Sequence, residues 1–238
     1  MELNGTRGRQ GGTTWSRSGP RGSDERADPG ELERLGSPVT SLAALRVLLP
    51  PPLSPIVLRG TPVARAARIA AGRLVGVARG RAELGPRALG GRSVLARADD
   101  PAVRDRLNDH KGRERWRPVA PVVAAADVGR WFAPAWPSPW MILTLVATAA
   151  AAAGPLRGAV HVDGTARVQT VGPTDDPFLA GVLARLAPRG HAAVLNTSLN
   201  RRGEPIVDTA HEALEAARAM RLDALVLDDR LLDLIPFP

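Results

Sequence analysis

The apolar positions of this 238-residue chain show little periodicity before residue 61 and alternating helical and strand patterns after it. Residues 1–60 are rich in Gly, Arg, Ser and Pro, which is typical of a disordered leader, with one short helix predicted near residues 41–49. The later patterns predict helices at 62–71, 101–108, 177–186 and 209–220, and strands at 74–78, 93–96, 118–124, 166–171, 192–195 and 223–227. An alanine run at 147–153 is expected to form a surface loop or a fraying helix. We therefore predict one mixed α/β domain over residues 61–238.

Polar residues stand where the predicted helices begin. Thr61 is placed to cap the first helix, and Asp99 and Asp100 precede the second. Thr209 and Glu212 have the spacing of a capping box. These signals support the predicted helix boundaries.

The composition excludes several classes of site. Cysteine is absent, which rules out disulfides, thiolate zinc sites and cysteine nucleophiles. No run of about 18 apolar residues occurs, and the amino terminus lacks the basic segment and apolar core of a secretory signal. We therefore expect no membrane span and a cytoplasmic protein.

Positive charge is concentrated in one part of the chain. The net charge is +8, and residues 61–130 carry 15 basic and 7 acidic residues. Guanidinium groups bind phosphate oxygens in pairs, so this segment suits nucleic acid or small phosphorylated molecules. The chain has no Tyr and three Phe, which disfavours nucleic acid because few aromatic rings are present to stack on bases. Lys111 is the single lysine of the chain. It has either a specific role in a site or the ordinary role of a solvated surface cation.

Residues 80–93 are the first candidate for phosphate binding, because they combine several glycines with three arginines between two predicted strands. Glycines let backbone N–H groups approach an anion, and Arg87 and Arg92 would clamp its oxygens. The alternative is a tight loop with solvated arginines.

A second cationic segment spans residues 111–117 and surrounds Glu114 and Trp116 with four basic residues. An ammonium and guanidinium groups beside one carboxylate suit an ATP or acyl-phosphate pocket, although such a run is usually a solvated face. Trp116 is expected to pack in the core.

A polar turn and strand cover residues 161–170. Alternation along the predicted strand places Arg167 and Gln169 on one face. The alternative is that the turn only leads the chain into a β-hairpin and has no functional role. No spacing supports His161 as a general base, since a histidine at a strand end more often packs or forms a structural hydrogen bond.

In residues 195–205 an apolar strand leads into Asn196, Thr197, Ser198 and Asn200. Amide and hydroxyl groups of this kind donate to carbonyl or phosphoryl oxygens. No acid–base partner has the spacing of a Ser-His-Asp triad, so Ser198 is expected to be a donor and not a nucleophile.

At these four segments the sequence resembles the carboxyl-terminal domain of the O-carbamoyltransferases, a family that includes nodulation-factor and antibiotic-tailoring enzymes. The matching motifs are residues 80–81, 83 and 85–93, residues 111–114 and 117–118, residues 161–170, and residues 196–200 with 203–207. They occur in the family's order and cover most of residues 61–232. The chain has Leu84, Gly91, Val119 and Leu199 where the family tends to have Phe, Asn, Phe and Phe. The resemblance implies a YrdC-like fold, a mixed twisted sheet with flanking helices.

The same resemblance implies that carbamoyl phosphate and ATP react to give carbamoyl adenylate and pyrophosphate, with or without magnesium. It implies catalytic roles for Lys111, Arg167, Ser198 and Asn200. It also implies contacts with ATP or substrate for Arg81, Arg87, Arg92, Ser93, Arg113, Arg117 and Thr197. Lys111 and the arginines are expected to bind phosphate groups. Ser198 and Asn200 are expected to contact the carbamoyl group or the α-phosphate.

Members of the family carry a long amino-terminal ATPase-like domain that passes the carbamoyl group to an acceptor hydroxyl, and residues 1–60 are too few to form one. We therefore expect a separately encoded partner domain or a truncated copy. Two alternatives stay open. One is a threonylcarbamoyl-adenylate synthase-like enzyme of tRNA modification, which would use threonine and bicarbonate. The other is a non-catalytic fragment or an RNA-binding protein.

Overall fold

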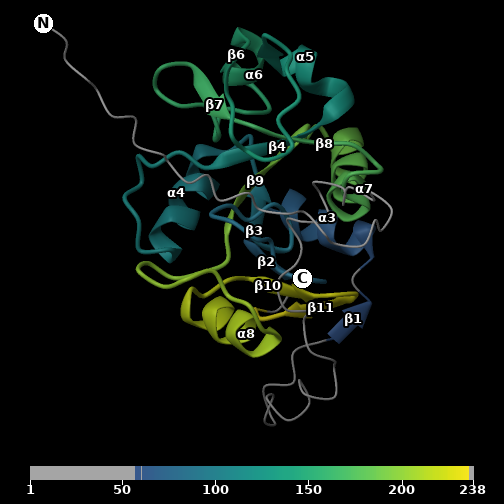
Figure 1. The fold of residues 1–238 in the computed structure, drawn as a ribbon, viewed down its shortest axis with the longest axis vertical. Coiled ribbons are helices and arrows are strands. Elements are labelled where there is room, and N and C mark those ends of the chain that lie inside the picture. The colour runs from purple at the N-terminus through teal and green to yellow at the C-terminus, as the bar shows by residue number, and fades with distance from the viewer. Residues whose placement is uncertain (1–56, 60, 236–238) are drawn as a thin grey trace, which may run out of the picture.

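A mixed eight-stranded sheet with helices on both faces forms the centre of the computed structural model, which describes residues 57–59 and 61–235 (Figure 1). The strand order is β1 (Val57–Arg59), β11 (Arg230–Asp233), β10 (Ala224–Leu227), β2 (Val75–Ala78), β3 (Arg92–Arg97), β9 (Ala193–Ser198), β4 (Ala120–Ala124) and β8 (Gln169–Val171). The pairs β10–β2 and β4–β8 are parallel, and the other neighbours are antiparallel. The predicted mixed sheet is confirmed.

Both faces of this sheet are buried. Alternate residues of β2 belong to two different apolar clusters, Val75 and Val77 to one and Ala78 to the other. Two neighbouring helices, α3 (Pro62–Ala70) and α7 (Pro177–Leu186), cover the first face, while α4 (Pro101–His110) and α8 (Ala210–Ala219) supply side chains to the second cluster (Figure 1). Burial on both faces explains why the strands are apolar runs.

A smaller sheet lies beyond one end of the main sheet, at the top of Figure 1. It consists of β5 (Phe132–Ala133), β6 (Thr144–Ala147) and β7 (Thr165–Arg167), accompanied by α5 (Val128–Trp131) and α6 (Ala149–Ala153). Short 3₁₀ turns at Ala125–Asp127 and Ala187–Arg189 complete the described elements. Phe132 and Leu145 of the small sheet share an apolar cluster with Leu195 of the main sheet, so the two sheets have a common core.

The predicted helix starts are confirmed. The Thr61 hydroxyl accepts a hydrogen bond from the Ala64 N–H, and the Asp100 carboxylate accepts one from the Ala102 N–H. Thr209 and Glu212 form the reciprocal capping box at the start of α8. The alanine run is the short helix α6, which Thr148 caps.

One predicted strand is wrong. Residues 166–171 do not form a single strand, because Val168 separates β7 in the small sheet from β8 in the main sheet. The Val168 N–H donates to the Leu143 carbonyl, and the Val168 carbonyl accepts from the Ser138 hydroxyl. Arg167 and Gln169 therefore belong to different sheets and share no strand face.

Part of the predicted leader is described and the rest is not. Val57–Arg59 pairs with β11 at the edge of the main sheet. The helix predicted at 41–49 lies outside the described residues. Within the described part of the chain, no helix has both the length and the apolar character needed to cross a membrane.

Candidate functional site

Lys111 follows α4 and has a buried side chain, 5% exposed. Its ammonium donates to the Ser198 carbonyl, the Asn200 carbonyl (2.8 Å) and the Asn200 Oδ1 (3.1 Å). Burial, and secondarily the charge of Arg113, lowers the pKa of Lys111 from 10.5 to about 7. Lys111 thus ties the end of α4 to the segment that leaves β9.

The Ser198 and Asn200 side chains are themselves linked. The Ser198 hydroxyl donates to Asn200 Oδ1 at 2.6 Å, and the Asn200 Nδ2 donates to the Glu204 carbonyl at 2.8 Å. Both residues line a cavity of about 600 Å³ together with Glu83 and Asp208. Of the four predicted amide and hydroxyl residues, Ser198 and Asn200 are therefore joined directly, whereas Asn196 bonds to Gln169 and Thr197 to Arg113.

Three arginines line a second cavity of about 400 Å³, the cationic cavity, which is lined by Arg113, Arg117, Arg167, Trp116, Thr144, His161, Pro118 and Ala120. The Arg113 Nη1 donates to the Thr197 hydroxyl at 3.2 Å. The buried Nε atoms of Arg113 and Arg167 have no hydrogen-bond partner among the described residues. Because these two Nε atoms have almost no accessible surface, an anion in the cavity would contact the terminal nitrogens of the guanidinium groups.

The arginines of the cationic cavity repel one another. Burial, followed by the charges of Arg87 and Arg113, lowers the pKa of Arg167. Burial, followed by the charge of Arg117, lowers the pKa of Arg113, although Glu114 opposes this shift. An anion bound in this cavity would relieve the repulsion.

Trp116 is not a core residue, contrary to the prediction. Its side chain is 76% exposed at the cationic cavity, and the Arg117 guanidinium lies 5.9 Å from the centre of its ring. Arg117 also pairs with Glu114, with 2.7 Å between Nε and Oε2. Trp116 and Arg117 are both exposed and therefore place an aromatic face and a cation at the mouth of the cavity.

Arg92 is fully buried, and its guanidinium donates to backbone carbonyls. The acceptors are Asp208 (2.8 and 3.0 Å), Arg79 (3.0 Å), Gly91 (3.0 Å) and Gly80 (3.2 Å). Burial lowers the pKa of Arg92, while Glu83 opposes the shift most strongly among the nearby carboxylates. These contacts place Arg92 in the framework of the glycine-rich segment.

The Glu83 carboxylate accepts hydrogen bonds from the backbone of the same glycine-rich segment. One carboxylate oxygen accepts from the Leu89 N–H at 2.7 Å and also from the Gly91 N–H. A Cβ at Gly91 would lie 3.0 Å from this carboxylate, so a residue with a side chain there would require Glu83 to shift. Glu83 and Arg92 together determine the path of residues 83–92.

The remaining predicted residues lie around this framework. Ser93 is fully buried opposite Ser198 across β3 and β9, and its hydroxyl finds no partner within the described chain. Arg81 and Arg87 are exposed and line neither cavity, although Arg87 is near enough to lower the pKa of Arg167. The structure thus forms two groups and leaves Arg81 at the periphery. Arg113, Arg117 and Arg167 line the cationic cavity, Lys111, Ser198 and Asn200 are joined by hydrogen bonds beside the other cavity, and Thr197 contacts the first group through Arg113.

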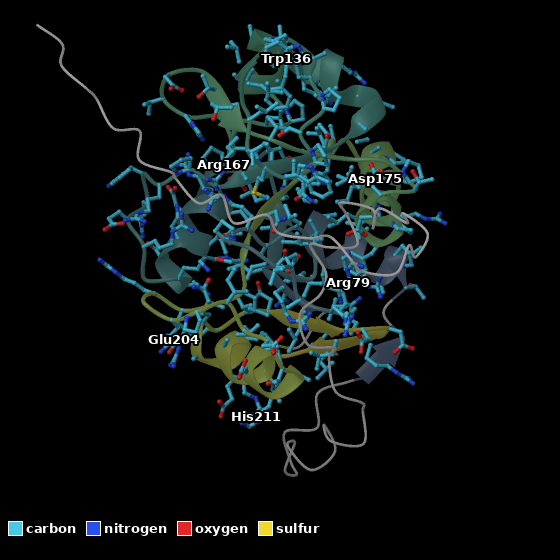
Figure 2. All side chains as sticks on the ribbon, in the orientation of Figure 1. Arg79, Trp136, Arg167, Asp175, Glu204 and His211 are labelled. Carbon is cyan, nitrogen blue, oxygen red and sulfur yellow. The ribbon has the colours of Figure 1, made fainter. Side chains whose placement is uncertain are left out.

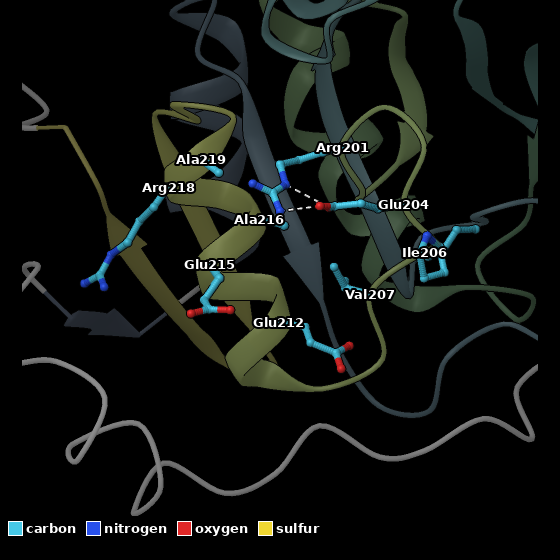
Figure 3. A pocket seen from close by; sticks show the side chains of 10 residues that line it. Arg201, Glu204, Ile206, Val207, Glu212, Glu215, Ala216, Arg218 and Ala219 are labelled. Carbon is cyan, nitrogen blue, oxygen red and sulfur yellow. Dashed lines mark hydrogen bonds and ion pairs between the residues drawn. The ribbon is translucent and has the colours of Figure 1, made fainter.

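The two cavities lie apart, as the labelled residues of Figure 2 show. Arg167 lines the cationic cavity in the upper half of the view, and Glu204 lines the cavity with Ser198 in the lower half. A third hollow, of about 660 Å³, lies between residues 204–207 and α8 (Figure 3). Arg201 and Glu204 form an ion pair at its edge. Residues 204–207 therefore line both this hollow and the cavity that holds Ser198.

Sequence reasoning missed two residues of the cationic cavity. The sequence offered no spacing to support His161 as a general base, and Thr144 lies in a stretch with no motif. The polar turn that follows His161 was the available signal, because it brings Thr165 back to hydrogen-bond distance of the imidazole.

The carbamoyltransferase C-terminus family model matches residues 66–233. The 3′-hydroxymethylcephem-O-carbamoyltransferase of Streptomyces clavuligerus is 38% identical over 162 residues, which is 68% of this chain and 30% of that protein. Nodulation protein U of Sinorhizobium fredii is 38% identical over 154 residues, which is 64% of this chain and 27% of that protein. The chain therefore spans less than a third of the length of these curated relatives.

A solved structure of a P. abyssi Sua5 variant has a TM-score of 0.50 and 18% sequence identity, covering 71% of this chain and 48% of that one. This likeness bears on the fold alone and agrees with the predicted YrdC-like architecture. The family match covers most of the described residues and includes all four motif segments. The chain belongs to the carbamoyltransferase C-terminus family.

Proposed function

We propose that this domain joins carbamoyl phosphate and ATP into carbamoyl adenylate. Water cleaves the bond between the carbamoyl oxygen and phosphorus, which releases phosphate and leaves a carbamate, and a carbamate oxygen then displaces pyrophosphate from the α-phosphorus of ATP. The balanced reaction therefore consumes one water and releases both phosphate and pyrophosphate. The observation that carries the proposal is the cationic cavity, which Arg113, Arg117 and Arg167 line and where burial and neighbouring positive charges lower the pKa of Arg113 and Arg167. Such a cavity suits two phosphorylated reactants held close together.

The residues of the site contribute in different ways. Arg113, Arg117 and Arg167 would hold phosphate oxygens, and Ser198 would donate to the carbamoyl or α-phosphate oxygen. Lys111 supports this donor by fixing the backbone of Ser198 and Asn200. Thr197 orients Arg113, Ser93 is the direct cross-strand partner of Ser198, and Arg92 shapes the glycine-rich segment. Arg81 and Arg87 would act from outside the cavities, through charge.

Magnesium has no protein cage within the described residues, where no group of three or more His, Asp or Glu could hold a metal ion. Magnesium usually keeps several waters and is bound largely through substrate phosphates. A magnesium ion would therefore enter with the nucleotide, and its main ligands would be phosphate oxygens and water.

Transfer to an acceptor hydroxyl would need a region equivalent to the part of the relatives that this chain does not span. A separately encoded ATPase-like domain is one source of that region. The name of the Streptomyces relative describes O-carbamoyl transfer to a hydroxymethylcephem, and only the carbamoyl chemistry is proposed for this chain.

Pyrophosphate release from ATP by the purified chain, with and without carbamoyl phosphate, tests the proposal. Release should require carbamoyl phosphate and fall at least tenfold in Arg167→Met, because one charge-assisted contact to a phosphate contributes roughly 1.5–3 kcal/mol. Arg185→Met is the matched control, since Arg185 is exposed on α7 and should leave the rate unchanged.

The competing functions give different results in the same assay. Release that requires threonine and bicarbonate would replace this proposal with a threonylcarbamoyl-adenylate synthase-like activity. Salt-sensitive RNA binding without nucleotide turnover would favour the RNA-binding alternative. No release, with ATP binding absent as well, would make the chain a non-catalytic fragment.

A further inference from the structure

His161 stands at one end of a short chain of hydrogen bonds. The Thr165 hydroxyl donates to the Asp163 carboxylate at 2.7 Å and lies 3.2 Å from His161 Nδ1. The same turn is closed by the backbone, since the His161 N–H donates to the Thr165 carbonyl at 2.7 Å. The imidazole is therefore fixed by its own loop.

The direction of these bonds determines the tautomer of His161. A hydroxyl has one proton, and an ionised carboxylate accepts hydrogen bonds but donates none. Hydrogen bonds from Thr165 lower the pKa of Asp163, so this carboxyl is ionised at neutral pH. Thr165 must then give its proton to Asp163 and accept from His161 Nδ1–H. In a neutral imidazole this leaves Nε2 as an acceptor.

The cationic cavity has many donors and few side-chain acceptors. Arg113, Arg117, Arg167 and Trp116 can only donate, and among the described residues that line it only Thr144 and His161 have side chains that accept. Neither the Thr144 hydroxyl nor His161 Nε2 makes a hydrogen bond within the described chain, but the hydroxyl can also donate, whereas Nε2 can only accept. The cavity therefore suits a ligand with acceptors over most of its surface and one donor group.

Carbamoyl phosphate fits this description, because its phosphate and carbonyl oxygens accept while its amine donates. We infer that His161 selects the carbamoyl group, with Nε2 accepting a hydrogen bond from the carbamoyl amine while the arginines hold the phosphate. This inference rests on the proposed function and adds a specificity-determining residue to it. Acetyl phosphate, which has a methyl group in place of the amine, would leave Nε2 without a partner.

The charge state of His161 agrees with this role. Burial lowers its pKa from the ordinary 6.5, Asp163 opposes the shift and Arg167 adds to it. The imidazole is therefore neutral at pH 7.5. A protonated imidazole would present one more donor to the cavity and would repel the amine.

The test is calorimetric titration of the full chain, with a non-hydrolysable ATP analogue present, against carbamoyl phosphate and acetyl phosphate at pH 7.5. The wild-type chain should prefer carbamoyl phosphate by about tenfold, which is the effect of one well-placed buried hydrogen bond. In His161→Ala the preference should fall to about one, mainly through weaker binding of carbamoyl phosphate. His161→Gln, whose side-chain carbonyl lies near the position of Nε2, should restore part of it.

The control is His211→Ala, since His211 is exposed on α8 and should leave the preference intact. Equal wild-type affinity for the two acyl phosphates, or a preference that survives in His161→Ala, would overturn the inference and leave the proposed function standing. Binding of the ATP analogue with no binding of either acyl phosphate would overturn the proposed function, and the inference with it.

Discussion

Lys111 is a buried residue that positions the backbone of the site residues Ser198 and Asn200. The sequence singled it out as the only lysine, and the resemblance placed it on a phosphate. In the structure its ammonium donates to two backbone carbonyls and one side-chain oxygen. A bound phosphate would have to replace one of these acceptors. Its direct role with substrate stays a prediction, whereas its contacts with the 198–200 segment are observed.

The lowered pKa of Lys111 predicts a pH dependence of stability. The folded chain releases the lysine proton near pH 7, whereas the unfolded chain holds it up to 10.5. Between these values the unfolded state binds more protons, so the contribution of Lys111 to the free energy of unfolding rises with pH, by at most about 1.4 kcal/mol per unit. Urea unfolding of wild type and Lys111→Met at pH 6.5 and 9 should show a stability difference that grows in favour of wild type. A constant difference would contradict the lowered pKa.

The sequence predicted most of the polar residues that the structure brings together, because each follows a strand or helix with a clear pattern. It did not predict how Arg92 is used. An arginine beside glycines suggests a phosphate clamp, yet its carbonyl partners include Asp208, which is 116 residues away in sequence. Contacts over such separations depend on the tertiary fold, and periodicity carries no information about them.

At the scale of elements, the predictions succeeded where a single pattern spans one element. The helices and most strands of the main sheet appear within a few residues of their predicted bounds. The edge strand β1 and its neighbour β11 were not predicted. The segment around Val168 was predicted as one strand, because the alternation of residues continues while the chain passes from one sheet to the other. Alternation shows which side chains point the same way along one strand, but it cannot show that two strands follow each other without a turn.

Gly90 gives an element-scale prediction for the glycine-rich segment. Its φ of 121° disfavours residues with a Cβ, and a Cβ there would lie 2.8 Å from Leu179 of α7. Gly90→Ala should therefore destabilise the fold by about 2–3 kcal/mol, through backbone strain and overpacking together. Gly190→Ala is the matched control, because Gly190 has φ 83° and no atom within 4 Å of that Cβ position. Equal losses in thermal or urea unfolding would show that the contact with α7 has no effect.

At the scale of the whole molecule, the small sheet and the main sheet depend on one core. Phe132 of β5 is 1% exposed and belongs to the same cluster as Leu195 of β9 and Leu214 of α8. The composition and the alternation of elements predicted the α/β class, but the small sheet was not predicted, because its strands are two to four residues long and have one buried position each. Very short strands give too few residues for a period to be recognised.

Phe132→Ala should test this common core. The substitution should lower the free energy of unfolding by about 3–5 kcal/mol, and unfolding should remain a single transition by tryptophan fluorescence and by far-ultraviolet circular dichroism. Val146→Ala, at a position on β6 that is 54% exposed, should change stability by no more than about 0.5 kcal/mol. Two separate transitions in the wild-type chain would show that the small sheet unfolds independently.

The passage between the sheets at Val168 also limits how the chain can change in length. Arg167 reaches the cationic cavity, and two residues later the buried Gln169 donates to the Leu89 carbonyl and accepts from Asn196. Inserting or deleting one residue between them would turn one of these side chains away from its partners, because neighbouring residues of extended chain point in opposite directions. The exposed turn at Gly190, by contrast, has room for additions. Natural or designed length variants of this domain should therefore tolerate insertions near residue 190 and reject them between 167 and 169.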